Sequence, residues 1–424
     1  MKLDSRHPIQ FVSPTGLPKC RRRNEAEAIN KISGGLDMRL VRIGIVLAGL
    51  ALMGATAHAQ EAYVVGMSAA LTGPGASTVA GAAEGLRLYI DRLNKAGGVN
   101  GRQITLIVQD DQGEPSKAAA NAKKLLTQDN VSLLINTSLS STFAPMIAEA
   151  QRAGVPLLFA GSVCPSEVFP PANEFLFCTT SFSAAHDARA TIDFIKEKSG
   201  NKINIGLAAM AIPVSRLGID AAEKFSTEAG MTVIGKENIP PATADYTPFA
   251  TKIIQGNPDW VYCWAPWITE IKTFGALRKL GWKGGYALNV LPETEAELAQ
   301  IKDGELYAMG ANAMFFENLP VQKEISKSAK DAASTYKPEQ MSDGWIGGMT
   351  IETTLKVAGW PTTSAKLKEV MSTLKVDTKG LRGGPIEWTK DNHFRTKQYY
   401  RVYRWDTASS AIQIVSDWKG YEIK

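Results

Sequence analysis

Residues 96–126 read AGGVNGRQITLIVQDDQGEPSKAAANAKKLL, and this stretch decides the fold class. Its apolar segment Ile104–Gln109 predicts a buried strand that ends at two aspartates. Pro115 then begins an alanine-rich helix that reaches Gln128, because its apolar residues recur at helical spacing. The preceding segment Ala80–Ala96 is also helical, and Gly97-Gly98 ends it. A strand between two helices is the repeating unit of a parallel sheet that is covered on both faces.

The same alternation extends in both directions from this stretch. Further strands are predicted at Tyr63–Ala69, Ser132–Asn136, Leu157–Ala160, Ile203–Ala208, Thr232–Ile239 and Trp260–Trp264. The alternation stops near residues 175–183, restarts at Ala184 and continues to about Gly310, which predicts two α/β lobes. Residues 318–373 are helical again, and the final segments Tyr399–Trp405 and Ala411–Trp418 alternate like antiparallel edge strands.

The charge of the chain is unevenly distributed. The 424 residues are 44% hydrophobic, which is enough for two domains, and the formal net charge is +5. Residues 1–59 hold nine Lys or Arg and four acids, so the remainder has 38 of each sign. A neutral body with no basic stripe argues against nucleic-acid binding.

The N-terminal region has the layout of a secretory signal. Met38–Ala59 contains two arginines, then an apolar run, then small residues, which predicts export and cleavage before Gln60. The apolar run is shorter than the roughly 20 residues of a membrane span. No cysteine follows it, so we expect a periplasmic protein without a lipid anchor. Residues 1–37 are interpreted as an upstream start-site extension or as a disordered tail.

Three cysteines remain after that cleavage: Cys164, Cys178 and Cys263. An oxidising compartment allows a Cys164–Cys178 disulfide that leaves Cys263 unpaired. Three reduced, partly buried thiols fit the sequence equally well, because spacing alone does not supply the geometry of a disulfide.

Catalytic motifs are scarce. The glycine-rich loop at residues 73–77 lacks the third glycine of a dinucleotide-binding fingerprint. His186 and His393 are the histidines of the mature chain, and neither belongs to a zinc or nucleophile motif. Glu295 and Glu297 are interpreted as a solvated helix face. We therefore expect no enzyme activity, no cofactor and no metal.

Two loops at strand ends suit a carboxylate. Asn136–Thr142 is rich in hydroxyl groups, and Ala160-Gly161-Ser162 follows the next strand along the chain. Open α/β sheets bind ligands at the carboxyl ends of their strands, and hydroxyls with main-chain N–H groups can donate several hydrogen bonds to a carboxylate. Ordinary helix capping explains the same residues, so both interpretations remain.

Aromatic residues gather at a strand end in the second lobe. Trp260, Tyr262, Trp264 and Trp267 surround the position where the strand gives way to a loop. Such rings can pack on the apolar part of a ligand. We predict a pocket role for Trp267, whereas Trp264 is assigned equally to pocket or core.

Several of these segments resemble the periplasmic binding proteins of the branched-chain amino acid type. The resemblance is carried by LTGPGAS (71–77), by AGGVNGR with its following strand, Asp-Asp pair and Ala-rich helix, by RAGVPLLFAGS (152–162), by ADYTPFATKIIQGNPDWVY (244–262) and by LRKLGW (277–282). It covers nearly all of residues 61–420. It implies a type I periplasmic binding protein fold, with two Rossmann-like lobes joined by a hinge of three crossovers. The expected lobes are residues 60–180 with 316–398, and 181–315 with 399–424.

The resemblance also implies site residues. The family's carboxylate-binding serine falls at Ser140 or Ser141, and its small-small-hydroxyl triplet falls at Ala160, Gly161 and Ser162. These matches support a ligand that bears a carboxylate.

Other positions depart from the family pattern. Thr78 and Leu217 stand where the family has aromatic residues, and the acid that holds an α-ammonium group is replaced near Asn289. The two lost aromatics enlarge the pocket, which favours a larger or aromatic carboxylate. Asp343 and Trp345, at the start of a later helix, are further cleft candidates, and Asp343 offers an alternative amine partner.

The function implied by the resemblance is capture without chemistry. We expect a monomeric, extracytoplasmic receptor of an ABC importer that binds a small carboxylate-bearing ligand, an amino acid or another organic acid, and delivers it to permease subunits. Closure of the lobes would follow from differential affinity for the ligand. A ligand-sensing subunit of a signalling or regulatory system is the alternative with the same fold.

Overall fold

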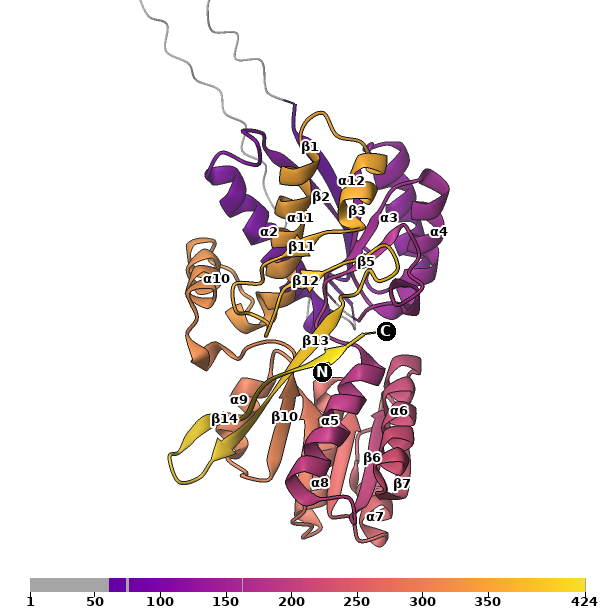
Figure 1. Cartoon of the computed structure of the whole chain (residues 1–424), viewed down its shortest axis with the longest axis vertical. Helices are drawn as coiled ribbons and strands as arrows, with labels where there is room; N and C mark the ends of the chain where they lie inside the picture. The colour runs from indigo at the N-terminus through magenta and orange to yellow at the C-terminus, as the bar shows by residue number, and fades with distance from the viewer. Residues whose placement is uncertain (1–60, 74–75, 162, 424) are drawn as a thin grey trace, which may run out of the picture. The chain divides into compact units, whose positions relative to one another are not determined.

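The computed structural model describes residues 61–73, 76–161 and 163–423 (Figure 1). The expected signal peptide, the extension before it and Ser162 lie outside the described residues. The predicted alternation of strands and helices is confirmed, and the strands form two large sheets. Within the described part of the chain, no helix combines the length and apolarity of a membrane crossing.

Lobe 1 is built on a parallel five-stranded sheet with the order β2-β1-β3-β4-β5. Its strands are β1 (Tyr63–Ala69), β2 (Ile104–Asp110), β3 (Leu133–Thr137), β4 (Leu157–Phe159) and β5 (Leu176–Cys178). The helices of this lobe are α2 (Ala76–Lys95), α3 (Pro115–Thr127), α4 (Phe143–Ala153), α10 (Pro320–Asp331), α11 (Ser342–Ala358) and α12 (Ser364–Met371). Pro115 begins α3 and Gly154 closes α4 in the left-handed conformation, as the sequence predicts.

Lobe 2 is built on a seven-stranded sheet with the order β14-β13-β10-β9-β8-β6-β7. Its strands are β6 (Asn204–Met210), β7 (Thr232–Ile239), β8 (Trp260–Trp264), β9 (Gly285–Asn289), β10 (Leu306–Gly310), β13 (Lys397–Asp406) and β14 (Ala411–Glu422). Its helices are α5 (Ala184–Ser199), α6 (Pro213–Ala229), α7 (Thr247–Gln255), α8 (Trp267–Lys279) and α9 (Thr294–Ile301). The two last strands are antiparallel, as predicted. Of these two, only β14 lies at the edge of the sheet, because β13 is paired on both sides.

Each sheet buries apolar side chains on both faces, because successive residues of a strand point to opposite sides. In lobe 1, Val65 and Met67 pack with α2 and α11, whereas Leu134 and Leu157 pack with α3 and α4. In lobe 2, α5 and α6 cover one face, and α7, α8 and α9 cover the other. Figure 1 shows α2 and α11 side by side on lobe 1. The short strands β11 (Lys375–Val376) and β12 (Ile386–Glu387) pair outside the main sheets.

The chain passes between the two sheets three times: after β5, after β10 and before β13. Buried polar side chains connect these crossovers. Arg395 donates to the Thr180 carbonyl and, at 2.6 Å, to Gln398 Oε1. Gln398 Nε2 in turn donates to the carbonyl of Ser181 at 2.7 Å. The first and third crossovers are therefore joined by side chains that point inward, and the expected three-crossover hinge is confirmed.

The cysteine alternatives left open by the sequence are resolved by the structure. Cys164 and Cys178 form a disulfide that connects the loop after β4 to the end of β5. Cys263 is a buried free thiol in β8. The disulfide links the loop after β4 to β5, beside the expected ligand site.

Candidate functional site

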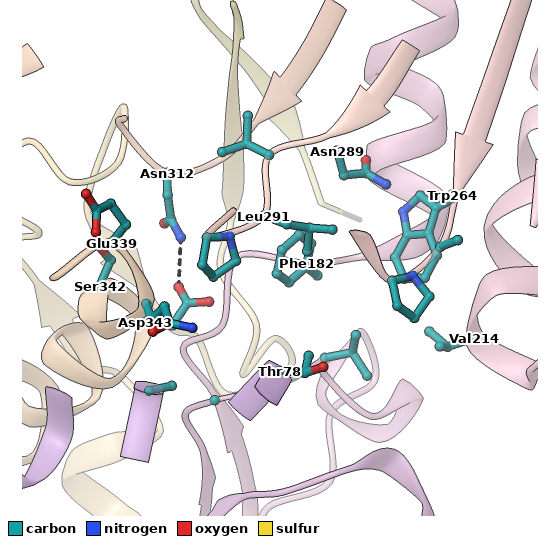
Figure 2. A pocket seen from close by; sticks show the side chains of 18 of the residues that line it. Thr78, Phe182, Val214, Trp264, Asn289, Leu291, Asn312, Glu339, Ser342 and Asp343 are labelled. Atoms are coloured by element: carbon teal, nitrogen blue, oxygen red, sulfur yellow. Dashed lines mark hydrogen bonds between the residues drawn. The ribbon is translucent and has the colours of Figure 1, made fainter. Parts of the chain in front are cut away.

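A cavity of about 200 Å³ lies where the two lobes face each other, and both lobes line it. Lobe 1 contributes Thr78, Leu139, Ser140, Gly161, Glu339 and Asp343 among others, and lobe 2 contributes Val214, Trp264, Asn289, Leu291 and Glu295 among others. Phe182, in the first crossover, lies between them. Figure 2 shows a polar side formed by Asn312, Glu339, Ser342 and Asp343, with Trp264 and Val214 on the opposite side.

The position of the cavity follows from the parallel sheets. The carboxyl ends of parallel strands meet at one edge, and the helices that follow begin there. Helices α2, α6 and α9, which follow parallel strands, place the first-turn residues Thr78, Val214 and Glu295 in the lining. Helix α11, which follows no strand directly, adds its first-turn residue Asp343. Helix N-termini carry partial positive charge and unpaired N–H groups, so their convergence favours negatively charged groups near the cavity.

The hydroxyl-rich turn of lobe 1 is mostly occupied by its own hydrogen bonds. Ser138 donates to the buried Asp111 at 2.5 Å, and Thr142 donates to the Leu139 carbonyl at 2.7 Å. Ser141 donates to the carbonyl of Gly113 at 2.9 Å. Ser140 lines the cavity, and its hydroxyl has no hydrogen-bond partner among the described residues. Helix capping does not explain these hydroxyls, because α4 has no side-chain cap hydrogen bond and Ser138, Ser141 and Thr142 act as donors. The carboxylate interpretation stays a prediction for Ser140.

Trp264 combines the two roles that the sequence assigned to it equally. The ring is 5% exposed and belongs to the core on the α5–α6 side of the lobe 2 sheet, yet it also lines the cavity. Its indole Nε1 donates to Asp187 Oδ2 at 3.1 Å, and the Tyr400 hydroxyl donates to Asp187 Oδ1 at 2.7 Å. Burial raises the pKa of Asp187 to about 7, although the donated hydrogen bonds oppose the rise.

A second buried acid supports Asn289. Glu270 Oε1 accepts hydrogen bonds from the Ala265 N–H at 3.3 Å and from Asn289 Nδ2 at 3.2 Å. Ala265 and Asn289 both line the cavity, whereas Glu270 is 1% exposed. Burial raises the pKa of Glu270 well above its usual range. Glu270 is thus hydrogen-bonded to Asn289, the position where the family pattern predicts an acid. Its hydrogen bonds hold Ala265 and Asn289 in the cavity wall.

Asp343 is paired inside the protein. Its Oδ1 accepts from Arg382 at 2.7 Å and from Asn312 Nδ2 at 3.0 Å, and its Oδ2 accepts from the Ser181 hydroxyl at 3.0 Å. The Arg382 side chain is 3% exposed and neutralises this carboxylate. Asp343 therefore ties lobe 1 to two crossovers, which leaves less of its charge for the amine role considered from the sequence.

The charged side chains of the lining are all acidic in the described residues: Glu295, Glu339 and Asp343. The Phe315 N–H donates to Glu295 at 2.5 Å, and burial raises the pKa of Glu295. Glu339 Oε2 is buried without a partner among the described residues. The interpretation of Glu295 as part of a solvated helix face is wrong, because α9 begins at the cavity. No cluster of described His, Cys, Asp and Glu side chains has the arrangement of a metal site.

The comparisons with known proteins agree with this architecture. Residues 62–410 match the model of the periplasmic binding protein family. The chain belongs to this family. The resemblance to binding proteins of the branched-chain amino acid type, and the type I periplasmic binding fold that it implies, are thereby confirmed.

Individual relatives extend over most of the chain at low identity. The Leu/Ile/Val-binding protein homolog 7 of Brucella suis is 22% identical over 82% of this chain and 90% of its own length. An amino acid binding protein of Pseudomonas aeruginosa is 33% identical, over 31% of this chain and only 35% of its own length. A branched-chain amino acid ABC transporter structure from Thermus thermophilus, with bound valine, has a TM-score of 0.72 at 15% identity and covers 86% of this chain and 97% of its own.

The structure brings half of the predicted site residues of this periplasmic binding protein to one cavity. Thr78, Ser140, Gly161, Trp264, Asn289 and Asp343 all line it. Gly161 is required there, because an added Cβ would lie 2.9 Å from the Cβ of Thr137. Whether these residues bind ligand stays a prediction.

Five other predicted residues do not line the cavity. Ala160 is fully buried in the lobe 1 core, and Ser141 is held by Gly113. Leu217 is 57% exposed on α6, next to the residue that faces Trp264. Trp345 is fully buried and packs edge-on against Tyr89. Trp267, the first residue of α8, is half-buried outside the lining.

Several lining residues were missed by the sequence reasoning. Phe182 and Asn312 lie in the crossovers that follow β5 and β10, and Glu339 lies in the short helix η4 (Pro338–Met341). Val214 and Leu291 follow strands β6 and β9. A search for ligand residues after every predicted strand would have found Val214. The strands β5, β9 and β10, which precede Phe182, Leu291 and Asn312, were not individually predicted, and Glu339 follows no strand directly.

Proposed function

We propose that this protein is the extracytoplasmic receptor of an ABC importer, that it captures a small carboxylate-bearing molecule in the cavity and that it delivers this molecule to a permease. The observation that carries the proposal is the shared lining, since residues of both lobes line one cavity at the three-crossover hinge. A solute that contacts both lobes favours the arrangement in which they enclose it.

The carboxylate assignment is supported by Ser140 and by the helix starts of lobe 1. Ser140 is the hydroxyl-bearing residue of its turn that lines the cavity, and its hydroxyl makes no hydrogen bond to another described residue. Thr78 lies in the first turn of α2, where main-chain N–H groups and the helix dipole favour an anion. The apolar part of the ligand would then lie against Trp264 and Val214, on the side opposite Asp343 (Figure 2).

Binding without catalysis is supported by the chemistry of the lining. Nucleophilic catalysis needs a nucleophile with a base in hydrogen-bond reach. Burial lowers the pKa of His186 to about 4, and its ring nitrogen is hydrogen-bonded to the hydroxyl of Ser183 at 2.7 Å. Neither residue is part of the cavity lining. We also propose that the N-terminal segment directs export, that it is cleaved before Gln60 and that the mature protein acts as a monomer.

A ligand screen on the mature chain tests the proposal. Residues Gln60–Lys424 form a compact unit of their own, so protein starting at Gln60 is suitable. Amino acids, aromatic acids and dicarboxylates are screened by thermal shift, because a solute that binds the folded form raises its melting temperature. Each hit is then compared with its primary amide by calorimetry. Equal affinity for acid and amide would refute the carboxylate assignment.

Two neighbouring serines provide a matched pair. Ser140→Ala should weaken binding of the best acid by about 1.5–3 kcal/mol, the usual contribution of a hydrogen bond to a charged group. Ser141→Ala should leave affinity nearly unchanged, because that hydroxyl is engaged with the Gly113 carbonyl. Equal effects of both substitutions would contradict the assignment of Ser140. Delivery is tested by uptake of the labelled acid in cells with and without the gene.

A further inference from the structure

We propose that Asp187 is a positioning residue of the ligand cavity, that it holds the indole of Trp264 in the cavity wall, and that gain or loss of its proton changes this hold. The inference rests on the proposed function in one respect, since it treats Trp264 as a wall of the ligand site. It assigns no ligand contact to Asp187 itself, which does not line the cavity.

The geometry around Asp187 consists of three donors and one buried carboxyl. Asp187 lies in the first turn of α5 and is 2% exposed. Tyr400, from β13, donates its hydroxyl to Oδ1 at 2.7 Å. Trp264, from the end of β8, and the Ser183 N–H donate to Oδ2 at 3.1 and 3.2 Å. Helix α5 and the strands β8 and β13 of lobe 2 are thus joined through the Asp187 side chain.

The orientation of the indole depends on this carboxyl. An indole Nε1–H can only donate a hydrogen bond, and Asp187 is the acceptor that it reaches among the described residues. On one face the ring is in contact with α6, where a Cβ added at Gly218 would lie 2.8 Å from Trp264 Cγ. Close packing fixes the plane of the ring, and the hydrogen bond fixes its rotation in that plane. Both constraints act on a side chain that lines the cavity.

The charge state of Asp187 is balanced by its surroundings. Four titratable or charged groups on the elements packed around Asp187 interact with it: Tyr262 on β8, Glu270 on α8, Tyr400 on β13 and Arg395 before β13. Burial favours the protonated form, whereas the three donors and Arg395 favour the carboxylate. The balance places the pKa of Asp187 at about 7, so both forms are populated near neutral pH.

The two forms hold Trp264 differently. The carboxylate accepts all three hydrogen bonds, and a bond to an ionised acceptor is about twice as strong as a neutral one. When Asp187 takes a proton from solvent, its new O–H must itself donate. The Trp264 Nε1–H and the Ser183 N–H cannot accept, so the Tyr400 oxygen is the acceptor within reach, and the Tyr400 hydroxyl must turn. The indole then keeps a weaker, neutral hydrogen bond.

Nuclear magnetic resonance of the indole N–H groups tests this inference without any solute. The Trp264 resonance of the mature, ¹⁵N-labelled protein is assigned by its loss in Trp264→Phe. We expect this resonance to shift with a midpoint near pH 7. The shift should be absent in Asp187→Asn, which has no titrating proton at this position. A flat resonance between pH 5 and 9, or the same titration in Asp187→Asn, would overturn the proposal.

Two further variants keep the test decisive. Tyr400→Phe removes one donor to the carboxylate, so the midpoint should rise, and an unchanged midpoint would contradict the network even if Asp187→Asn does not fold. Asp193, on the same helix, pairs with Arg189 and has a partly exposed side chain, so Asp193→Asn should leave the titration unchanged. If no acid binds in the ligand screen but the Trp264 resonance still titrates, the proposed function is refuted and this inference stands. If an acid binds but the Trp264 resonance does not titrate, only this inference is refuted.

Discussion

Replacing Asp187 by Asn should change how stability depends on pH. A buried acid whose pKa rises from 3.8 to about 7 on folding binds more protons in the folded than in the unfolded state between those pH values. The free energy of unfolding therefore falls as pH rises through this window and becomes independent of Asp187 above it. A rise of about three pKa units, at about 1.4 kcal/mol each, corresponds to a loss of about 4 kcal/mol. Asn does not titrate and keeps a carbonyl oxygen for Trp264, so the variant should lack this loss.

Urea unfolding between pH 4 and 8 measures the effect. The free energy of unfolding of Asp187→Asn, taken relative to that of the natural protein, should increase by about 4 kcal/mol from the acidic to the neutral end. Comparison at each pH cancels the contributions of acids that do not interact with Asp187. Asp193→Asn serves as the control and should give a difference that does not follow pH in this way. Parallel curves for Asp187→Asn and the natural protein would refute the reasoning.

Two other substitutions probe the scaffold of the site. Gly218→Ala places a Cβ 2.8 Å from Trp264 Cγ and should destabilise the protein by about 1–3 kcal/mol and weaken solute binding, as seen in urea unfolding and calorimetry. Gly275 is also in a helix, but nothing lies within 4 Å of a Cβ added there, so Gly275→Ala should be neutral or stabilising by about 0.5–1 kcal/mol. Equal losses of stability in both variants would exclude packing as the cause. Replacing Cys164 and Cys178 together by Ser opens a loop with a sequence separation of 14 and should cost about 3 kcal/mol in urea unfolding. A midpoint equal to that of the oxidised protein would contradict this role of the disulfide.

The fold was accessible from the sequence because its signals are local. Strands such as Tyr63–Ala69 coincide with the structure, and Pro115 and Gly154 mark real helix ends. The three-residue strand β5 and the strands β9 and β10 were not individually predicted. Short, fully buried strands lack a periodicity that distinguishes them from other apolar segments. The alternation of elements was sufficient for the fold class, although it did not reveal each strand.

The site was only partly accessible for the opposite reason. Ser140 and Gly161 follow strands directly, so a rule about strand ends found them. Asp187 and Glu270 gave no such signal, because their importance comes from Trp264 and from wall atoms contributed by other elements. Hydrogen bonds between residues separated by 77 positions, as for Trp264 and Asp187, cannot be derived from local patterns. The sequence therefore indicated the edge of the sheets but not the acids behind it.

The order in which the strands enter the two sheets has a consequence for biosynthesis. Strand β10 lies between β9 and β13 in lobe 2, and lobe 1 receives α11 only after every parallel strand of lobe 2 has been made. A chain truncated before residue 397 would expose one side of β10, and a chain truncated before residue 342 would leave the face of the first sheet under α2 only partly covered. Neither lobe is a continuous stretch of polypeptide. The sheet of lobe 2 is complete, and the sheet of lobe 1 is fully covered, only when the C-terminal third of the chain has been synthesised.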